Sequence, residues 1–466
     1  MTLRAGVGRA PLAVPLGGDM MGYGARRGKA RGQRDPLFAR ALYLESAAGS
    51  GDRCLLVELD VCLVAAAHAE QLRARIAART EVPVERILVG CTHTHSGPET
   101  GLFAALAGGE TPALAAPWLE AGLGAAEAAR RAALPARLGT ARAAARIGRN
   151  RRVAGGPVDP EVLVVRVDRA DRSPLAVLYI HGCHPTVLGH DNLDYSADWP
   201  GAASRAIEAA LPGAAAIFAL GAHADVDPRT RGLHDLAVSG QSVGASFAEV
   251  DALGREVGEA VAAAAAQIAT DADARVAADT TRCQLPVHGA ADPAARPAAL
   301  EAARARALAA LELPAERDPN VLEWFGLIDE RTAGLPRDQA RPRIAAARVY
   351  LRDRTAPRFA GGLAPAVAVQ VLRLGDAWLL GLPLEATVDV GLDWKARLRG
   401  APGALVSIAN GWLRYLPHPR NFAEPEAEQK YEILMSTFVP DAAARLLDAG
   451  EALRARLAGA TPFIAA

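Results

Sequence analysis

The sequence predicts an α/β fold in which a mixed β-sheet is flanked by helices and a metal site lies at the carboxyl ends of the strands. Short apolar runs alternate with helical stretches along most of the 466 residues, an order typical of βαβ units with parallel strands. Several of these runs end directly in polar clusters. Ligands of open α/β sheets gather beyond the carboxyl ends of strands, so the clusters predict one cleft built from distant segments.

The composition excludes several classes of protein. Hydrophobic residues make up 51% and charged residues 22% of the chain, and Lys plus Arg equal Asp plus Glu at 52 each. This balance gives no basic field for nucleic acid or an anionic membrane. No uninterrupted apolar run is long enough for a membrane span, and the amino terminus lacks the apolar core of a signal peptide. The five cysteines are scattered without a C-x-x-C pair, which favours reduced thiols in a cytoplasmic protein. The oligomeric state is not set by these features.

The first elements follow from apolar periodicity and turn residues. Residues 11–36 are rich in Gly, Pro and Arg and are expected to form loop. Residues 37–46 and 54–59 are predicted strands, residues 62–80 have helical spacing, and residues 87–89 form a further apolar run. This order of strand, helix and strand predicts a βαβ unit.

The same alternation continues toward the carboxyl terminus. A polar loop is expected at residues 148–152, and a hairpin around the turn at residues 375–376. Proline-broken, charged helices around residues 290–350 predict an insertion packed on the outside of one catalytic domain that spans residues 1–466. The remaining predicted elements are helices at 112–133, 200–211 and 250–270 and strands at 161–167, 175–180, 214–220, 367–374, 378–382 and 405–409.

Candidate site residues come directly after the predicted strands. They are Asp60, His93 with His95, His184, Asp225 with Asp227, Glu385 and Tyr415. Residues i and i+2 of an extended segment point to the same side, so His93 and His95 are expected to face one cleft. Two histidines and a glutamate form a common catalytic zinc set with one position left for water. His181 and His223 remain alternatives for the second histidine or for core positions.

Other residue types in these segments suit hydrolysis. Zinc lowers the pKa of bound water to about 7 and polarises a carbonyl oxygen, and a further His or Asp can move the proton. An arginine from Arg149, Arg151 or Arg152 is a candidate to hold an oxyanion or an anionic substrate group. Structural roles compete: Glu385 at a helix start suits the helix dipole, and the aspartates before Pro228 suit a turn.

Several motifs together resemble the neutral/alkaline non-lysosomal ceramidase family, zinc-dependent amidases that cleave the N-acyl bond of ceramide. The most specific is THTHSGP at residues 92–98, which matches the family's motif in full. The resemblance covers most of the chain and is closest to short bacterial relatives. The other matching segments are residues 6–10, 21–23, 35–41, 150–151, 382–385, 410–415 and 431–432, and His184 followed by Ser196, Ala197, Asp198 and Gly201.

The resemblance implies roles for individual residues. It places zinc on His93, His184, Glu385 and Tyr415, and it favours His184 over His181 as the second histidine. Residue types and resemblance together give a catalytic set around this zinc. Its members are His95, Arg151, Asp225, Asp227 and Tyr431.

The chain also departs from the family pattern. Asp227 stands where ceramidases have a serine, so a serine nucleophile is excluded there and metal-activated water is the expected attacking group. Leu384 replaces a glycine, and a short insertion separates Tyr415 from Tyr431. The chain ends soon after the catalytic region, which leaves no room for the family's immunoglobulin-like domain, and extracellular ceramide is therefore not the expected substrate.

These observations predict a zinc-dependent amidohydrolase that cleaves an N-acyl bond, ceramide-like or other, of a small or lipid-like amide. An ester or lactone hydrolase is the alternative within enzymes, because the same metal and water serve both reactions. A non-catalytic zinc- or ligand-binding relative is the alternative from another class.

Overall fold

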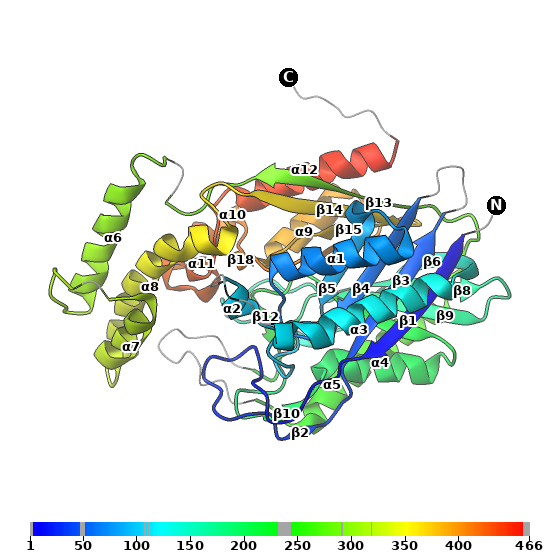
Figure 1. The fold of residues 1–466 in the computed structure, drawn as a ribbon, viewed down its shortest axis with the longest axis horizontal. Helices are drawn as coiled ribbons and strands as arrows, with labels where there is room; N and C mark the ends of the chain where they lie inside the picture. Colours follow the sequence, from blue (N-terminus) through cyan, green and yellow to red (C-terminus); the bar gives the residue numbers. More distant parts are fainter. Residues whose placement is uncertain are drawn as a thin grey trace.

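The computed structural model describes residues 3–46, 52–106, 109, 112–231, 244–289, 292–317 and 319–459. Two β-sheets lie face to face between two layers of helices (Figure 1). Three apolar clusters separate the layers: one between helices and the first sheet, one between the sheets, and one between the second sheet and its helices. The mixed α/β fold predicted from the sequence is confirmed. Because both faces of each sheet are covered, many strands are continuous apolar runs.

The first sheet has eight strands in the order β11-β9-β8-β6-β1-β3-β4-β5. Strands β4 and β5 are parallel, as are β9 and β11, and a helix connects each pair. The predicted βαβ unit is therefore present. The strands are β1 (Arg4–Pro11), β3 (Phe38–Glu45), β4 (Arg53–Leu59), β5 (Ile87–Cys91), β6 (Leu134–Ala144), β8 (Glu161–Arg169), β9 (Pro174–His181) and β11 (Ala215–Leu220).

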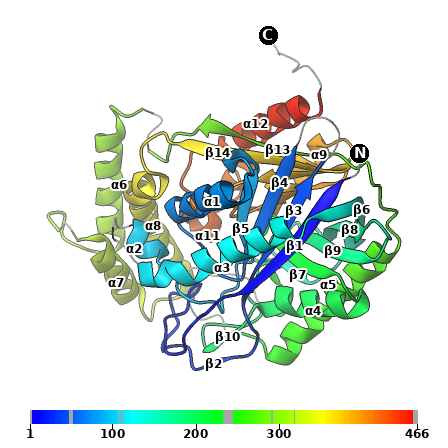
Figure 2. The ribbon, with the colours of Figure 1, turned by 45° about the vertical axis from the view of Figure 1, so that its right-hand side comes forward.

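Helices α1 (Ala66–Thr80), α3 (Pro112–Arg131), α4 (Asp198–Ala210) and α5 (Phe247–Ala266) cover the outer face of this sheet (Figure 2). The α3 backbone approaches β1 closely at two glycines. A Cβ atom at Gly8 would lie 2.0 Å from the carbonyl oxygen of Ala125, and one at Gly6 would lie 2.1 Å from that of Ala129. Only glycine allows this approach.

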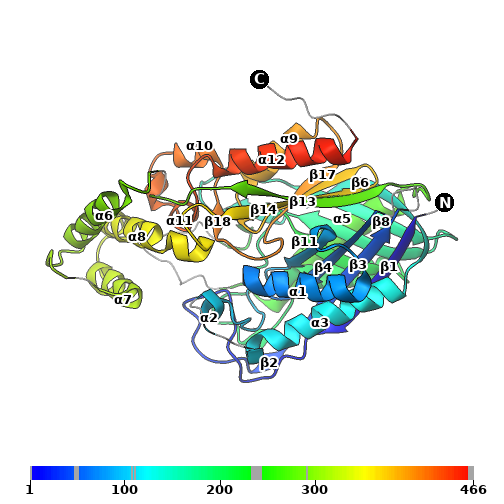
Figure 3. The same cartoon turned by 45° about the horizontal axis from the view of Figure 1, so that its top comes forward.

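The second sheet contains β13 (Val276–Gln284), β14 (Ala366–Leu374), β15 (Ala377–Gly381) and β17 (Gly403–Val406), in that order. Strands β14 and β15 form the predicted antiparallel hairpin. Helices α9 (Val388–Arg397) and α12 (Ala442–Leu457) pack on its outer face (Figure 3). The segment between β15 and α12, which contains the predicted site residues Glu385 and Tyr415, therefore belongs to the second sheet and its connections.

Helices α6 (Arg296–Ala310), α7 (Val321–Thr332) and α8 (Arg337–Ala360) pack around an apolar cluster of their own, to one side of the sheets (Figure 1). Helix α8 continues through Pro342, where the sequence predicted a break, and through Pro357. Packing of its buried face against α6 and α7 offsets the lost backbone hydrogen bonds. The single-domain division stays a prediction.

Sequence periodicity missed several elements. Strands β6 and β13 contain several half-buried or exposed polar residues and were not predicted. The expected polar loop at residues 148–152 contains strand β7, which pairs with β12. Within the described ranges, no helix is both long and apolar enough to cross a membrane. The remaining elements are β2 (Gly32–Gln33), η1 (Val84–Arg86), α2 (Leu102–Leu106), β7 (Gly148–Asn150), β10 (Asp194–Tyr195), β12 (Val226–Pro228), β16 (Glu385–Ala386), β18 (Tyr415–Leu416), α10 (Pro419–Phe422), η3 (Ala427–Gln429) and α11 (Tyr431–Leu434).

Candidate metal centre and its pocket

Four buried side chains from both sheets converge on one point. The Nε2 atoms of His93 and His184 each lie 3.6 Å from Oε2 of Glu385, and Nε2 of His223 lies 3.5 Å from it. The histidines follow β5, β9 and β11 of the first sheet, whereas Glu385 begins β16, just after β15 of the second. The centre therefore forms where strand ends of the first sheet meet the second.

Backbone carbonyl groups orient the three imidazoles. Because a carbonyl oxygen only accepts, each Nδ1 carries a proton, and Nε2 of each imidazole presents a lone pair when the ring is neutral. Nε2 of His184, Nε2 of His223 and Oε2 of Glu385 have no hydrogen-bond partner within the described part of the chain. Convergent, unpaired acceptors in a buried site are the arrangement that a cation satisfies. The anchoring contacts are His93 Nδ1 to Cys62 O at 2.9 Å, His184 Nδ1 to His223 O at 2.9 Å, and His223 Nδ1 to Gly221 O at 3.1 Å.

The electrostatics of the centre agree with a bound cation. Burial alone would raise the pKa of Glu385, but the charge of His93 and the close contacts of His184 and His223 with the carboxylate hold this pKa well below its usual range. Burial opposes and Cys62 and Glu385 favour protonation of His93, whose pKa rises to about 10. Burial, with Arg151 and His223, lowers the pKa of His184 to about 3. Without a metal ion, the positive charge beside Glu385 is the His93 imidazolium. A bound cation would take the place of that proton, and three imidazoles with one carboxylate form a ligand set that suits zinc.

His95 lies beside this group. Its Nε2 is 3.2 Å from Nε2 of His93, and its ring packs edge-on against Tyr23 with 4.9 Å between centroids. Gly22 has a φ of 112°, and a Cβ atom there would lie 2.5 Å from Cγ of His95. The Gly22-Tyr23 pair of the sequence motif therefore shapes the space around this imidazole.

Glu385 is positioned by its neighbours on the second sheet. Strands β16 and β18 are parallel and place Tyr415 directly beside Glu385. The indole nitrogen of Trp412 donates to Oε1 of Glu385 at 2.8 Å, which leaves Oε2 facing the histidines. Periodicity gave no role to Trp412, although it lies within the motif at residues 410–415.

Arg151 links several predicted catalytic residues. Its guanidinium donates to Glu432 at 2.8 Å, to Asp227 at 3.2 Å and to the hydroxyl of Tyr415 at 3.4 Å. Oδ1 of Asp227 also lies 3.6 Å from Nδ1 of His184. The ring of Tyr431 packs edge-on against that of Tyr415 at 5.4 Å. These contacts connect Asp227, beside His184, with Tyr415, beside Glu385.

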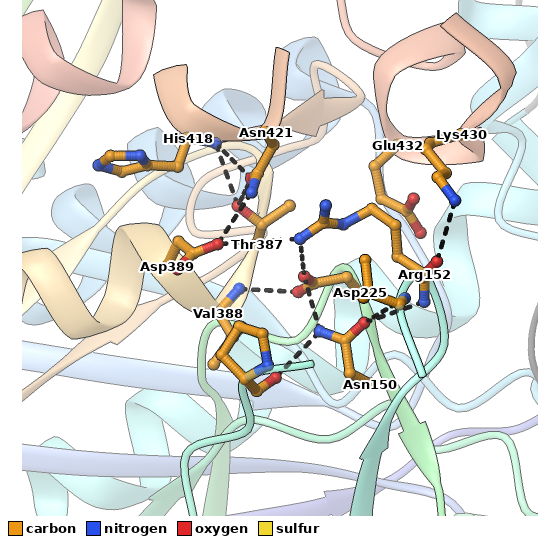
Figure 4. Close-up of polar contacts among 12 residues, drawn as sticks. Asn150, Arg152, Asp225, Thr387, Val388, Asp389, His418, Asn421, Lys430 and Glu432 are labelled. Atoms are coloured by element: carbon orange, nitrogen blue, oxygen red, sulfur yellow. Dashed lines mark hydrogen bonds and ion pairs between the residues drawn. The ribbon is translucent and has the colours of Figure 1, made fainter. Parts of the chain in front are cut away.

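Asp225 lies in a separate network (Figure 4). Its Oδ1 accepts from the backbone N–H of Val388 at 2.8 Å, at the start of α9, and its Oδ2 accepts from Arg152 at 3.1 Å and Asn150 at 3.2 Å. Arg152 also contacts Glu424. With both oxygens engaged, the Asp225 carboxylate holds the 150–152 segment against α9. A direct catalytic role for Asp225 stays a prediction.

The structure brings together most of the residues that the sequence indicated. His93, His184 and Glu385 share the centre, and His181 does not, because its Nδ1 contacts the carbonyl of Glu161 and its ring faces Trp199. His223, left open between ligand and core, completes the group. Its place at the end of β11 was the signal that could have identified it. Zinc ligation by Tyr415 stays a prediction.

A pocket of about 540 Å³ opens at the centre. His93, His95 and Glu385 form part of its wall, and α8 contributes another part. Most of the remaining wall is apolar, which suits a hydrophobic ligand. These apolar residues are Met20, Met21, Leu63, Phe325, Leu351, Phe359, Trp412, Leu434 and Met435.

Fold and site define an α/β protein with two stacked sheets and a buried candidate metal centre beside an apolar pocket. Among solved structures, the chain is similar to a ceramidase complexed with C2, at TM-score 0.70 and 20% identity over 100% of this chain and 77% of that one. It is also similar to neutral ceramidase from Pseudomonas aeruginosa, at TM-score 0.71 and 20% identity over 100% of this chain and 76% of that one. The chain thus has the neutral ceramidase fold, which confirms the resemblance at the level of the fold. No protein-family model matches the sequence, and no curated protein matches it.

Proposed function

We propose that this protein is a zinc-dependent amidohydrolase that cleaves an N-acyl bond by direct attack of water. The observation that carries the proposal is the convergence of three Nε2 atoms on Oε2 of Glu385, with each Nδ1 held by a backbone carbonyl. The shared fold with ceramidases supports an amide as the substrate.

His93, His184, His223 and Glu385 would hold the zinc ion, with Tyr415 beside Glu385 as a further candidate ligand. Zinc in such a site supplies a Lewis acid for the amide carbonyl and lowers the pKa of water to about 7. Burial, together with the nearby His93 and His184, keeps the pKa of His95 well below its usual range. A neutral His95 can accept a proton at the mouth of the centre and pass it to the leaving amine.

Arg151 and Tyr415 provide hydrogen-bond donors beside Glu385. The guanidinium of Arg151 is held by Glu432 and Asp227, so its remaining nitrogen stays directed at the Tyr415 hydroxyl. A fixed donor pair of this kind can stabilise an oxyanion. By the resemblance, Asp227 stands at the position of the serine in the ceramidase family. Its carboxylate is paired with Arg151, which leaves water as the attacking group.

The test combines metal content with turnover. Purified protein should contain about one zinc per chain by plasma mass spectrometry, lose activity on chelation and regain it with zinc. A panel should pair N-acyl amides with esters of the same acyl groups. Faster ester turnover would move the assignment to an esterase. If the protein contains zinc but hydrolyses no compound of the panel, the assignment would change to a non-catalytic zinc-binding protein.

A further inference from the structure

Arg414 is a buried cation in the pocket wall. Its side chain lines the pocket at 5% exposure, and its guanidinium stacks over Phe359 at 4.6 Å. Nη2 contacts Sδ of Met435 at 3.3 Å, whereas Nε and Nη1 have no hydrogen-bond partner in the described chain. Buried charges in proteins are normally paired. A pocket-lining guanidinium with two unsatisfied donors indicates that its partner is a ligand.

The acidic side chains that line the pocket do not form an ion pair with Arg414. The two carboxylates in the wall belong to Glu99 and Glu385. Glu99 accepts the backbone N–H groups of Thr100 at 3.1 Å and Gly101 at 3.0 Å. Glu385 is engaged by Trp412 and faces the histidines. None of the described ion pairs gives Arg414 a carboxylate.

Two further arginines strengthen the positive field. Arg348 and Arg352 line the same pocket. Arg352 donates to Asp353 at 2.8 Å, and its charge adds to the cost of keeping Arg414 buried. An arginine guanidinium keeps its charge at neutral pH, so three positive groups line this pocket. This wall therefore favours an anion.

The backbone ties Arg414 to the metal centre. Its carbonyl accepts the N–H of Glu385 at 3.0 Å, and its φ of 72° lies in the left-handed region. Strained non-glycine residues of this kind persist where the surroundings hold them in place. Phe359, under the guanidinium, packs edge-on against Trp412 at 5.9 Å, and Trp412 bonds Glu385. One ligand in the pocket can thus face both groups.

We propose that Arg414 binds a carboxylate of the substrate, so that the preferred substrates are N-acylated amino acids rather than uncharged amides such as ceramide. The planar guanidinium suits a carboxylate through two parallel hydrogen bonds, and the apolar wall suits the acyl chain. This inference rests on the proposed amide hydrolysis. In that reaction the C–N bond breaks, the water oxygen joins the acyl carbon, and the water protons leave with the carboxylic acid and the amine.

Three probes with one acyl chain test the assignment: N-dodecanoylglycine, N-dodecanoylethanolamine and N-dodecanoylphosphoethanolamine. The glycine amide should have the highest kcat/KM. Arg414→Met should reduce it on the order of 10²-fold, mainly through KM, the scale of a lost charged hydrogen bond. The neutral amide should lose far less, and Arg414→Lys should restore part of the loss. Arg445→Met, which removes an exposed guanidinium paired with Asp441, is the matched control.

Binding to the metal-free protein separates this inference from the proposed function. Calorimetric titration of the chelator-treated protein with N-dodecanoylglycine should show binding that Arg414→Met and Arg414→Gln abolish. Equal losses for all three probes would make Arg414 a support of the wall and overturn the inference. Preference for N-dodecanoylphosphoethanolamine would overturn the assignment of a carboxylate as the group that Arg414 binds. If no amide is hydrolysed, the proposed function fails, and the assignment of N-acylated amino acids as substrates fails with it.

Discussion

Nε2 of His223 lies 3.5 Å from Oε2 of Glu385, although the two residues belong to different sheets. His223 follows β11 of the first sheet, and Glu385 follows β15 of the second. The contact exists only when the apolar cluster between the sheets is formed. Binding of a metal ion at this centre would therefore be coupled to docking of the two sheets.

We expect His223→Ala to lose bound metal as completely as His184→Ala, because each imidazole presents one convergent lone pair. Zinc content by plasma mass spectrometry and a chelator competition titration measure this. His181→Ala is the matched control, since it removes a buried histidine outside the centre. Full zinc occupancy in His223→Ala would remove His223 from the ligand set.

We expect His95→Ala to keep its zinc and to lose on the order of 10²-fold in kcat, the usual scale for a proton-transfer or oxyanion group. The reason is its position 3.2 Å from His93, beside rather than within the group around Glu385. Metal analysis and steady-state kinetics on the same preparation check this. Loss of metal would instead make His95 a ligand.

Turnover should proceed without a covalent acyl-enzyme, because position 227, which the resemblance aligns with a serine of ceramidases, is an aspartate paired with Arg151. Hydrolysis in ¹⁸O-labelled water, sampled within a single turnover, should place label in the acid product with no burst of amine. Intact-protein mass spectrometry should find no acyl adduct. A trapped adduct on any side chain would contradict direct attack, and Asp227→Ser would then be the variant to compare.

Asp225→Ala should destabilise the protein by about 3 kcal/mol, the lower end of the cost of breaking a buried ion pair, because Arg152 retains Glu424. Urea unfolding measures the free energy, with Asp441→Ala, half-exposed on the surface, as control. The folded fraction should retain its zinc. Unchanged stability with abolished turnover would restore the direct catalytic role predicted for Asp225.

Glu58 should make stability fall as pH rises. Its buried carboxyl has no hydrogen-bond partner among the described residues, and burial, followed by Asp60, raises its pKa well above the usual range. Above an unfolded pKa of about 4.3, the folded state holds one more proton than the unfolded state, so stability drops by up to about 1.4 kcal/mol per pH unit until the folded pKa is reached.

Glu58→Gln should remove this slope and leave the protein more stable than the parent at alkaline pH. Urea unfolding from pH 5 to 9 measures the effect, and Glu81→Gln, at 79% side-chain exposure, is the control. An identical pH slope in parent and Glu58→Gln would show that Glu58 ionises freely in the fold.

The sequence determined the elements whose side chains are buried on both faces. Strands β5, β9 and β11 are largely apolar runs between turn residues, and their positions marked the histidines near their ends as candidates. The choice of His184 over His181 needed the resemblance, and His223 was left open. Strands β6 and β13 were not predicted because polar residues interrupt their apolar runs.

Only the tertiary structure decided which polar residues meet. Asp225 and Asp227 are two residues apart in the same segment, yet one carboxylate turns to Arg152 and α9 and the other to Arg151 and His184. His223 and Glu385 are joined across two sheets, and Arg414 is left without a carboxylate. Local periodicity reports which face of a strand is buried. Partners between distant segments are set by how the sheets pack, and that packing is absent from any local stretch of sequence.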